Sequence, residues 1–296
     1  MDRLLKSHMG ERNGDSARPI IIVGCPRSGT MLMSRILGGC SGHFLITEHS
    51  AKHKHCPEDR SGICDNDLWR AKFDYAGWDR KKKQPPVETP VFDKEKIEDV
   101  RNIYLTLSRG KRLVLKNPVH LCRIPFLKEM FPDAFFVFCV RNPWHTLQSM
   151  TIKGVESFLL RTPRNSTLPH DLLLKAAVSW QESIEIYLRE RDENWTAVRY
   201  EDLVSDPSET IERLFRFLAV NDTEYIGKAM ALVKDKRRNY WPVKNMFGKS
   251  RYKAEILEAI KEQNGHFSYP LDLRSLEGNS VSYFFSGIKK LVSVLF

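Results

Sequence analysis

The chain has 296 residues, of which 42% are hydrophobic and 28% are charged, with 16 glycines and 15 prolines spread along it. These values are typical of a globular protein and exclude a collagen-like, coiled-coil or low-complexity chain. Lysine and arginine number 47 against 37 aspartates and glutamates, and the resulting net charge of +10 predicts an anionic ligand such as a nucleic acid, a membrane surface or a phosphate-bearing small molecule.

Targeting and redox features of the sequence favour an intracellular location. There is no apolar run of about 18 residues, and residues 1–17 lack the apolar core of a signal peptide. The six cysteines are too sparse for a disulfide framework. We therefore expect a soluble cytoplasmic protein with a mobile N-terminal tail over residues 1–17 and one large domain over residues 18–275.

The first predicted elements are a buried strand and a helix joined by a glycine-bounded loop. Residues 19–23 are a short β-branched run, and residues 28–37 carry apolar side chains at helical spacing. The connection, GCPRSGT over residues 24–30, has the glycine spacing of a phosphate-binding loop, which presents backbone N–H groups and a helix N-terminus to an anion. Thr30 and Met31 stand where a nucleoside triphosphatase has its lysine and hydroxyl, which argues against an ordinary ATPase or GTPase.

Further strands and helices follow in alternation. Residues 44–47 form a candidate return strand, and further buried strands are predicted over residues 113–115, 135–140 and 197–198. Helices are predicted over residues 168–191 and from near Pro207 and Arg251. The alternation predicts an α/β fold of three layers, in which helices flank a central parallel sheet.

Chemically active side chains follow the predicted strands. Arg27 comes after the first strand, and Lys116, Arg141 and Tyr200 each end or follow a later one. Ligands of parallel sheets bind at the carboxyl ends of the strands. These residues are therefore expected to share one site.

Two stretches of the chain resemble the sulfotransferases that use 3′-phosphoadenosine 5′-phosphosulfate (PAPS). The sequence PRSGT at residues 26–30 is similar to the family's loop for the 5′-phosphosulfate. Residues 131–149 resemble its FPxxxFxxxxRxPxxxxxS pattern for the 3′-phosphate, in which Arg141 supplies a guanidinium fork and Ser149 lies two helical turns further on. The resemblance spans residues 19–218 and is strongest to bacterial and tyrosylprotein-type members.

The resemblance implies a P-loop-like fold, PAPS as co-substrate and no metal requirement. The YEDL sequence at residues 200–203 resembles the segment whose tyrosine contacts the adenine side of the nucleotide, and KNP at residues 116–118 resembles the segment whose lysine faces the transferring group. Arg27 and Lys116 would offset charge on the leaving phosphate oxygen. The implied nucleotide-binding residues are Arg27, Ser28, Gly29, Thr30, Arg141, Ser149 and Tyr200.

The transfer also needs a base for the acceptor hydroxyl. Glu48 matches the position of the glutamate base in tyrosylprotein sulfotransferases and related bacterial enzymes. His49 and His120 are rivals, because cytosolic members use a histidine that follows the lysine more closely than His120 follows Lys116. A further alternative is that Glu48 is a counter-ion that orients Lys116.

Three segments have weaker assignments. The stretch rich in histidine and cysteine after Glu48 matches no standard zinc spacing, so no metal is expected. Residues 50–95, which include Trp69 and the basic run 80–83, are either an acceptor lid or a surface insertion. Residues 276–296 predict an amphipathic helix that packs on the domain or a second subunit, or that contacts a membrane surface.

The expected function is therefore transfer of a sulfuryl group from PAPS to a hydroxyl of a carbohydrate, a glycolipid or another small molecule. A P-loop kinase is an alternative that leaves Arg141 and Ser149 unexplained. A basic nucleic-acid-binding module is another, but it needs positive charge along one face rather than at strand ends. No nucleic-acid partner is expected.

Overall fold

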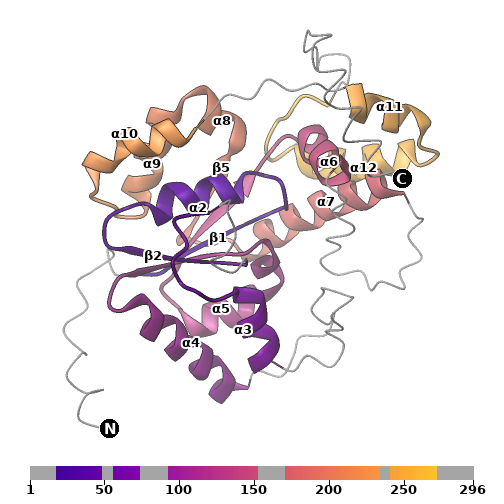
Figure 1. Cartoon of the computed structure of the whole chain (residues 1–296). Helices are drawn as coiled ribbons and strands as arrows, with labels where there is room; N and C mark the ends of the chain where they lie inside the picture. Colours follow the sequence, from indigo (N-terminus) through magenta and orange to yellow (C-terminus); the bar gives the residue numbers. More distant parts are fainter. Residues whose placement is uncertain (1–17, 49–55, 74–92, 153–170, 234–240, 272–296) are drawn as a thin grey trace, which may run out of the picture.

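The computed structural model describes residues 18–48, 56–73, 93–152, 171–233 and 241–271. Within these ranges five strands form one parallel sheet in the order β2-β3-β1-β4-β5 (Figure 1). The strands are β1 (Ile20–Gly24), β2 (His43–Thr47), β3 (Arg112–Lys116), β4 (Phe135–Val140) and β5 (Trp195–Arg199). The sheet confirms the predicted α/β class, and each expected strand, including the return strand β2, is present.

Helices cover both faces of the sheet, because alternate side chains of each strand point to opposite sides. Ile20 and Ile22 are buried against one group of helices, and Ile21 and Val23 against the other. Figure 1 shows the first group above the strands, α3, α4 and α5 of the second group below them, and α7 to the right. The first group comprises α2 (Thr30–Gly38), α8 (Tyr200–Ser205), α9 (Pro207–Phe217) and α10 (Thr223–Leu232). The second includes α3 (Asp65–Lys72), α4 (Lys94–Ser108), α5 (Ile124–Met130) and α7 (Leu172–Glu190).

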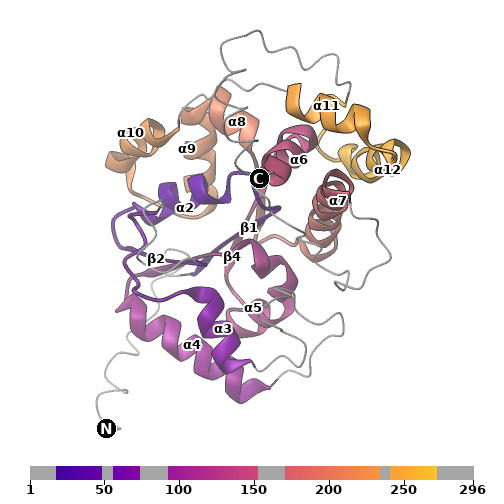
Figure 2. The same cartoon turned by 45° about the vertical axis from the view of Figure 1, so that its right-hand side comes forward.

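The remaining helices pack on α7 of the second group, either directly or through α6. Helix α6 (Pro143–Ile152) packs on α7, α11 (Trp241–Lys249) packs on α6, and α12 (Lys253–Asn264) packs along α7 (Figure 2). A short 3₁₀ helix, η3 (Pro118–Arg123), follows β3. No helix within the described ranges is long and apolar enough to cross a bilayer.

The strand register brings the carboxyl ends of the strands to one edge. Gly24 pairs with Cys139, and Thr47 pairs with Lys116. Val140 pairs with Arg199 at the end of β5. Because all five strands are parallel, the segments that leave them emerge at this edge, as the sequence predicts.

Several predicted segments lie outside the described residues. They are the tail 1–17, His49, the basic run 80–83 and the helix 276–296. Of the expected acceptor lid, residues 56–73 and 93–95 are described, and Cys56, Trp69 and Phe73 are buried in the core. Trp69 is 0% exposed, so this side chain does not face an acceptor.

Gly24 should be intolerant of any side chain. Its φ is 148°, and an added Cβ would lie 2.3 Å from the carbonyl oxygen of Cys139 on β4. Gly24→Ala should therefore lower the free energy of unfolding by roughly 2 kcal/mol or more, as measured by urea unfolding.

Gly227→Ala is the matched control, because an added Cβ within α10 would meet no atom within 4 Å beyond its chain neighbours and the helix's own backbone. It should raise stability by about 0.5 to 1 kcal/mol through helix propensity. Equal stability of the two variants would contradict the close approach of β1 and β4.

Candidate active site

The loop after β1 leaves the N-terminus of α2 open towards the carboxyl edge of the sheet. Gly29 precedes this nine-residue helix with φ 103°, and no side chain caps it. The hydroxyl of Ser28 turns inward and donates to the carbonyl of Cys139 at 2.8 Å. The amide groups of the first turn are therefore held in place to bind an anion.

Arg141 and Tyr200 pack directly on this loop. A Cβ on Gly29 would lie 2.7 Å from Cδ2 of Tyr200, so the ring needs a glycine beneath it. The guanidinium carbon of Arg141 lies 4.5 Å from the centre of the Tyr200 ring. Nη1 of Arg141 donates to the carbonyl of Arg27 at 3.1 Å. Residues that follow β1, β4 and β5 thus form one packed unit.

Arg27 joins the two halves of the nucleotide motif. Its backbone has φ 72°, and its side chain is exposed. Its Nε donates to the hydroxyl of Ser149 on α6 at 3.1 Å. The sequence resemblance assigns Arg27 to one phosphate group and Ser149 to the other, and the structure brings their side chains into contact.

An ion pair between Lys116 and Glu48 forms the other side of the site. Lys116 ends β3, and Glu48 follows β2 directly after Thr47, which pairs with Lys116 across the sheet. Their side chains are only 3% and 12% exposed. A partly buried pair of this kind orients both charges. Glu48 therefore contacts Lys116 and remains the candidate base.

His120 is an unsuitable base in this geometry. It is 0% exposed, and Nη1 of Arg123 lies 3.4 Å from its Nδ1. Because arginine only donates, Nδ1 accepts and the proton of the neutral ring lies on Nε2. Burial lowers the pKa of His120 to about 4. With Nδ1 occupied and no exposed surface, His120 cannot reach an acceptor hydroxyl.

The structure also shows two hydrogen-bonded carboxylates that the sequence analysis missed, the buried Asp59 and the partly exposed Glu201. Asp59 Oδ2 accepts from the N–H and the hydroxyl of Thr47 at 2.9 and 2.7 Å, which holds the end of β2 beside Glu48. Glu201 Oε1 accepts from the N–H of Asn142 at 3.1 Å. Burial opposes the ionisation of Glu201, but hydrogen bonds from His145 and Asn142 outweigh it and lower the pKa of this carboxyl. The YEDL sequence could have pointed to Glu201, whereas no motif marks Asp59.

Within its described part, this edge holds no group of metal ligands, and the thiols near the loop are protonated. Among the residues that the structure describes, no group of three or more histidine, cysteine, aspartate and glutamate side chains is placed to hold a metal ion. Burial raises the pKa of Cys25 and Cys139 to about 12, so both thiols stay protonated.

Comparison with known proteins identifies the family. A sequence model described as "Sulfotransferase family" matches residues 19–224. The chain belongs to the sulfotransferase family. The matched region runs from before β1 into α10 and contains Arg27, Glu48, Lys116, Arg141 and Tyr200. It confirms the resemblance seen in the sequence.

Curated relatives agree with this membership. Omega-hydroxy-beta-dihydromenaquinone-9 sulfotransferase Stf3 of Mycobacterium bovis and that of Mycobacterium tuberculosis are each 28% identical over 262 residues, covering 70% of this chain and 64% of the relative. The chain thus spans less than two thirds of their length.

Two solved sulfotransferases share the fold. The sulfotransferase domain of the Synechococcus PCC 7002 olefin synthase is 20% identical, with a TM-score of 0.50 and coverage of 86% of this chain and 96% of that one. Sulfotransferase STF9 from Mycobacterium avium is 16% identical, with a TM-score of 0.51 and coverage of 92% and 82%.

The burial of His120 should appear in the pH dependence of stability. Its pKa is lowered from 6.5 to about 4 in the folded protein. Between these pH values the His120 ring is therefore protonated in the unfolded chain but neutral in the folded protein. The free energy of unfolding should fall as the pH falls through this window, by about 3 kcal/mol from this residue. Urea unfolding at a series of pH values, compared with His120→Gln, measures this contribution as a difference in slope. Parallel pH profiles would contradict it.

Proposed function

We propose that this sulfotransferase transfers the sulfuryl group of PAPS to a hydroxyl group of a small-molecule or lipid acceptor. The observation that carries the proposal is the convergence of Arg27, Lys116 and Arg141 at the carboxyl edge of the sheet, around the open N-terminus of α2. A nucleotide with anionic groups at its 5′ and 3′ positions requires positive charge at two places in the site. The absence of a loop lysine disfavours the kinase alternative, and the grouping of cations at strand ends disfavours nucleic-acid binding.

The residues at this edge fit PAPS. Gly29 and Thr30, at the N-terminus of α2, would hold the 5′-phosphosulfate together with Arg27. Ser28 supports the loop instead, because its hydroxyl donates to the carbonyl of Cys139 and its N–H to the carbonyl of Cys25. Arg141 and Ser149 would hold the 3′-phosphate, because Arg27 contacts both segments and brings them next to the loop. Tyr200, which packs on Gly29, offers a ring face to the adenine side.

The chemistry requires positioning, charge stabilisation and one proton transfer. PAPS supplies an activated bond from sulfur to the 5′-phosphate oxygen, which breaks as the acceptor oxygen bonds to sulfur. Arg27 and Lys116 offset the negative charge that develops on the leaving phosphate oxygen. Glu48 accepts the proton of the acceptor hydroxyl. The ion pair holds Glu48 and Lys116 together, so the base and this cation act at one point.

The acceptor class is supported by the curated relatives, whose name describes a hydroxylated menaquinone. We infer an alcohol carried by a lipid, a glycolipid or another small molecule. Contact with a membrane or a second subunit through residues 276–296, and a cytoplasmic location, remain predictions.

Labelled PAPS tests the reaction itself. Incubation of the protein with sulfur-labelled PAPS and farnesol, octyl glucoside or 2-naphthol should label at least one acceptor. Phosphorylation of the same acceptors from ATP, without turnover of PAPS, would overturn the proposal in favour of a kinase.

The 3′-phosphate assignment predicts a specific loss of nucleotide affinity. Arg141→Ala should weaken binding of 3′-phosphoadenosine 5′-phosphate by roughly 2 to 4 kcal/mol, because a charged hydrogen-bonding partner is removed. Calorimetry with a metal chelator present measures the affinity. Lys128→Ala is the charge-matched control, since Lys128 pairs with Asp192 before β5, at the opposite edge of the sheet. Equal losses in both variants would show a general charge effect only.

Substitution of Glu48 separates a base from a counter-ion. Glu48→Gln keeps size and hydrogen bonding but removes basicity, so the single-turnover rate should fall by about 10² to 10⁴ fold while nucleotide affinity stays near wild type. A matching loss of affinity would instead assign Glu48 to the orientation of Lys116. A near-normal rate, with a collapse in His49→Gln, would transfer the role to His49.

A further inference from the structure

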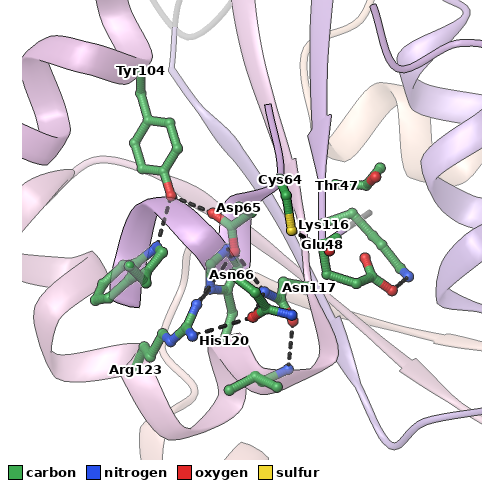
Figure 3. Close-up of polar contacts among 12 residues, drawn as sticks. Thr47, Glu48, Cys64, Asp65, Asn66, Tyr104, Lys116, Asn117, His120 and Arg123 are labelled. Atoms are coloured by element: carbon green, nitrogen blue, oxygen red, sulfur yellow. Dashed lines mark hydrogen bonds and ion pairs between the residues drawn. The ribbon is translucent and has the colours of Figure 1, made fainter. Parts of the chain in front are cut away.

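A buried polar cluster lies beside the Glu48–Lys116 pair, and none of the steps above uses it (Figure 3). Its centre is Asp65, the first residue of α3, with a side chain that is 1% exposed. The cluster comprises Asp65, Asn66, Trp69, Tyr104, Asn117, His120 and Arg123. Its burial excludes a direct part in binding and leaves a structural or positioning role.

Donors from α4, from η3 and from the residue that joins β3 to η3 converge on the Asp65 carboxylate. Its Oδ1 accepts from the hydroxyl of Tyr104 on α4. Its Oδ2 accepts from Nδ2 of Asn117 at 2.5 Å and from Nη1 of Arg123 at 3.3 Å. Nε2 of His120 lies 3.6 Å from the same oxygen. A buried carboxylate with this many donors has a defined position, because moving it would leave buried polar groups without partners.

The N-terminus of α3 also touches both chain segments that carry the ion pair. Cys64, directly before α3, donates from Sγ to the backbone carbonyl of Glu48 at 3.0 Å. Asp65 holds Asn117, the residue after Lys116. The side-chain oxygen of Asn117 accepts from the N–H of Val119 at 3.0 Å and so begins η3. The N-cap residue Cys64 and the first residue of α3, Asp65, thereby bridge the chain segments that follow β2 and β3.

Such a bridge is needed because the sheet ends where the site begins. The β2–β3 pairing stops at Thr47 and Lys116. Beyond it, the positions of Glu48 and Asn117 are set by contacts from outside the sheet. Cys64 and Asp65 provide such contacts on the side of α3.

We infer that Asp65 is a positioning residue for sulfuryl transfer: it holds Asn117, and through the adjoining backbone keeps Lys116 against Glu48. This inference rests on the proposed function. The nucleotide half of the site is built separately, from contacts of Arg141 with Arg27 and Tyr200 and of Arg27 with Ser149.

Asp65→Asn tests the role, because it puts an NH₂ group where donors converge. The value of kcat should fall at least about 10-fold while the affinity for 3′-phosphoadenosine 5′-phosphate stays within about 2-fold. Rates are measured with labelled PAPS and the panel acceptor that gives the highest wild-type rate. Tyr104→Phe is the matched control: it removes a donor to the same carboxylate but leaves the hydrogen bond between Asn117 and Asp65 in place, so it should lower stability and leave kcat within about 2-fold.

A double-mutant cycle separates positioning from general damage. If Asp65 acts through the ion pair, adding Asp65→Asn to the Glu48→Gln variant should lower kcat by less than about 2-fold further. Additive losses, or a loss of kcat in Tyr104→Phe equal to that in Asp65→Asn, would overturn the inference.

Asn117→Ser keeps the test decisive if Asp65→Asn fails to fold. Serine retains an oxygen that can cap η3 but removes the amide donor to Asp65. A crystal structure of this variant should show the Lys116–Glu48 contact opened, and kcat should fall as above. An unchanged contact with near-wild-type kcat would overturn the inference. An inactive wild type, by contrast, would refute the proposed function, and the crystal structure would still test the positioning role.

Discussion

The site depends on the close approach of β1 and β4 where Gly24 lies against the carbonyl of Cys139. The same carbonyl accepts the hydroxyl of Ser28, so it also holds the loop. Two residues beyond Cys139, Arg141 reaches back to the carbonyl of Arg27. One tight backbone contact between neighbouring strands thus sets the geometry of the loop, of the helix N-terminus and of the first cation beside it.

Cations at this edge are each held by a different kind of partner. Arg141 packs on an aromatic ring and a backbone carbonyl, Arg27 on a hydroxyl, and Lys116 on the Glu48 carboxylate. The Glu48 carboxylate neutralises the charge of Lys116 directly. The transfer half of the site therefore combines a cation with a candidate base.

Two buried carboxylates and one partly exposed carboxylate hold this edge in place. Asp59 holds the end of β2, Asp65 holds the segment after β3, and Glu201 holds the segment after β4. Buried charged groups of this kind contribute more to a single defined geometry than to net stability, since their desolvation offsets much of their attraction. Each of them joins a strand end to a helix or loop that is distant in the chain.

The sequence by itself determined the strands, the α/β class, the family and the residues at the strand ends, because periodicity and the PRSGT and YEDL motifs are local properties of the chain. It also narrowed the base to Glu48, His49 and His120. Only the tertiary structure decided that Arg27 meets Ser149, that Glu48 pairs with Lys116, and that Trp69 and His120 are buried. These contacts depend on the strand order β2-β3-β1-β4-β5, which makes neighbours of segments far apart in the chain. Local sequence patterns do not encode that order, because it results from the packing of the crossover helices on both faces of the sheet.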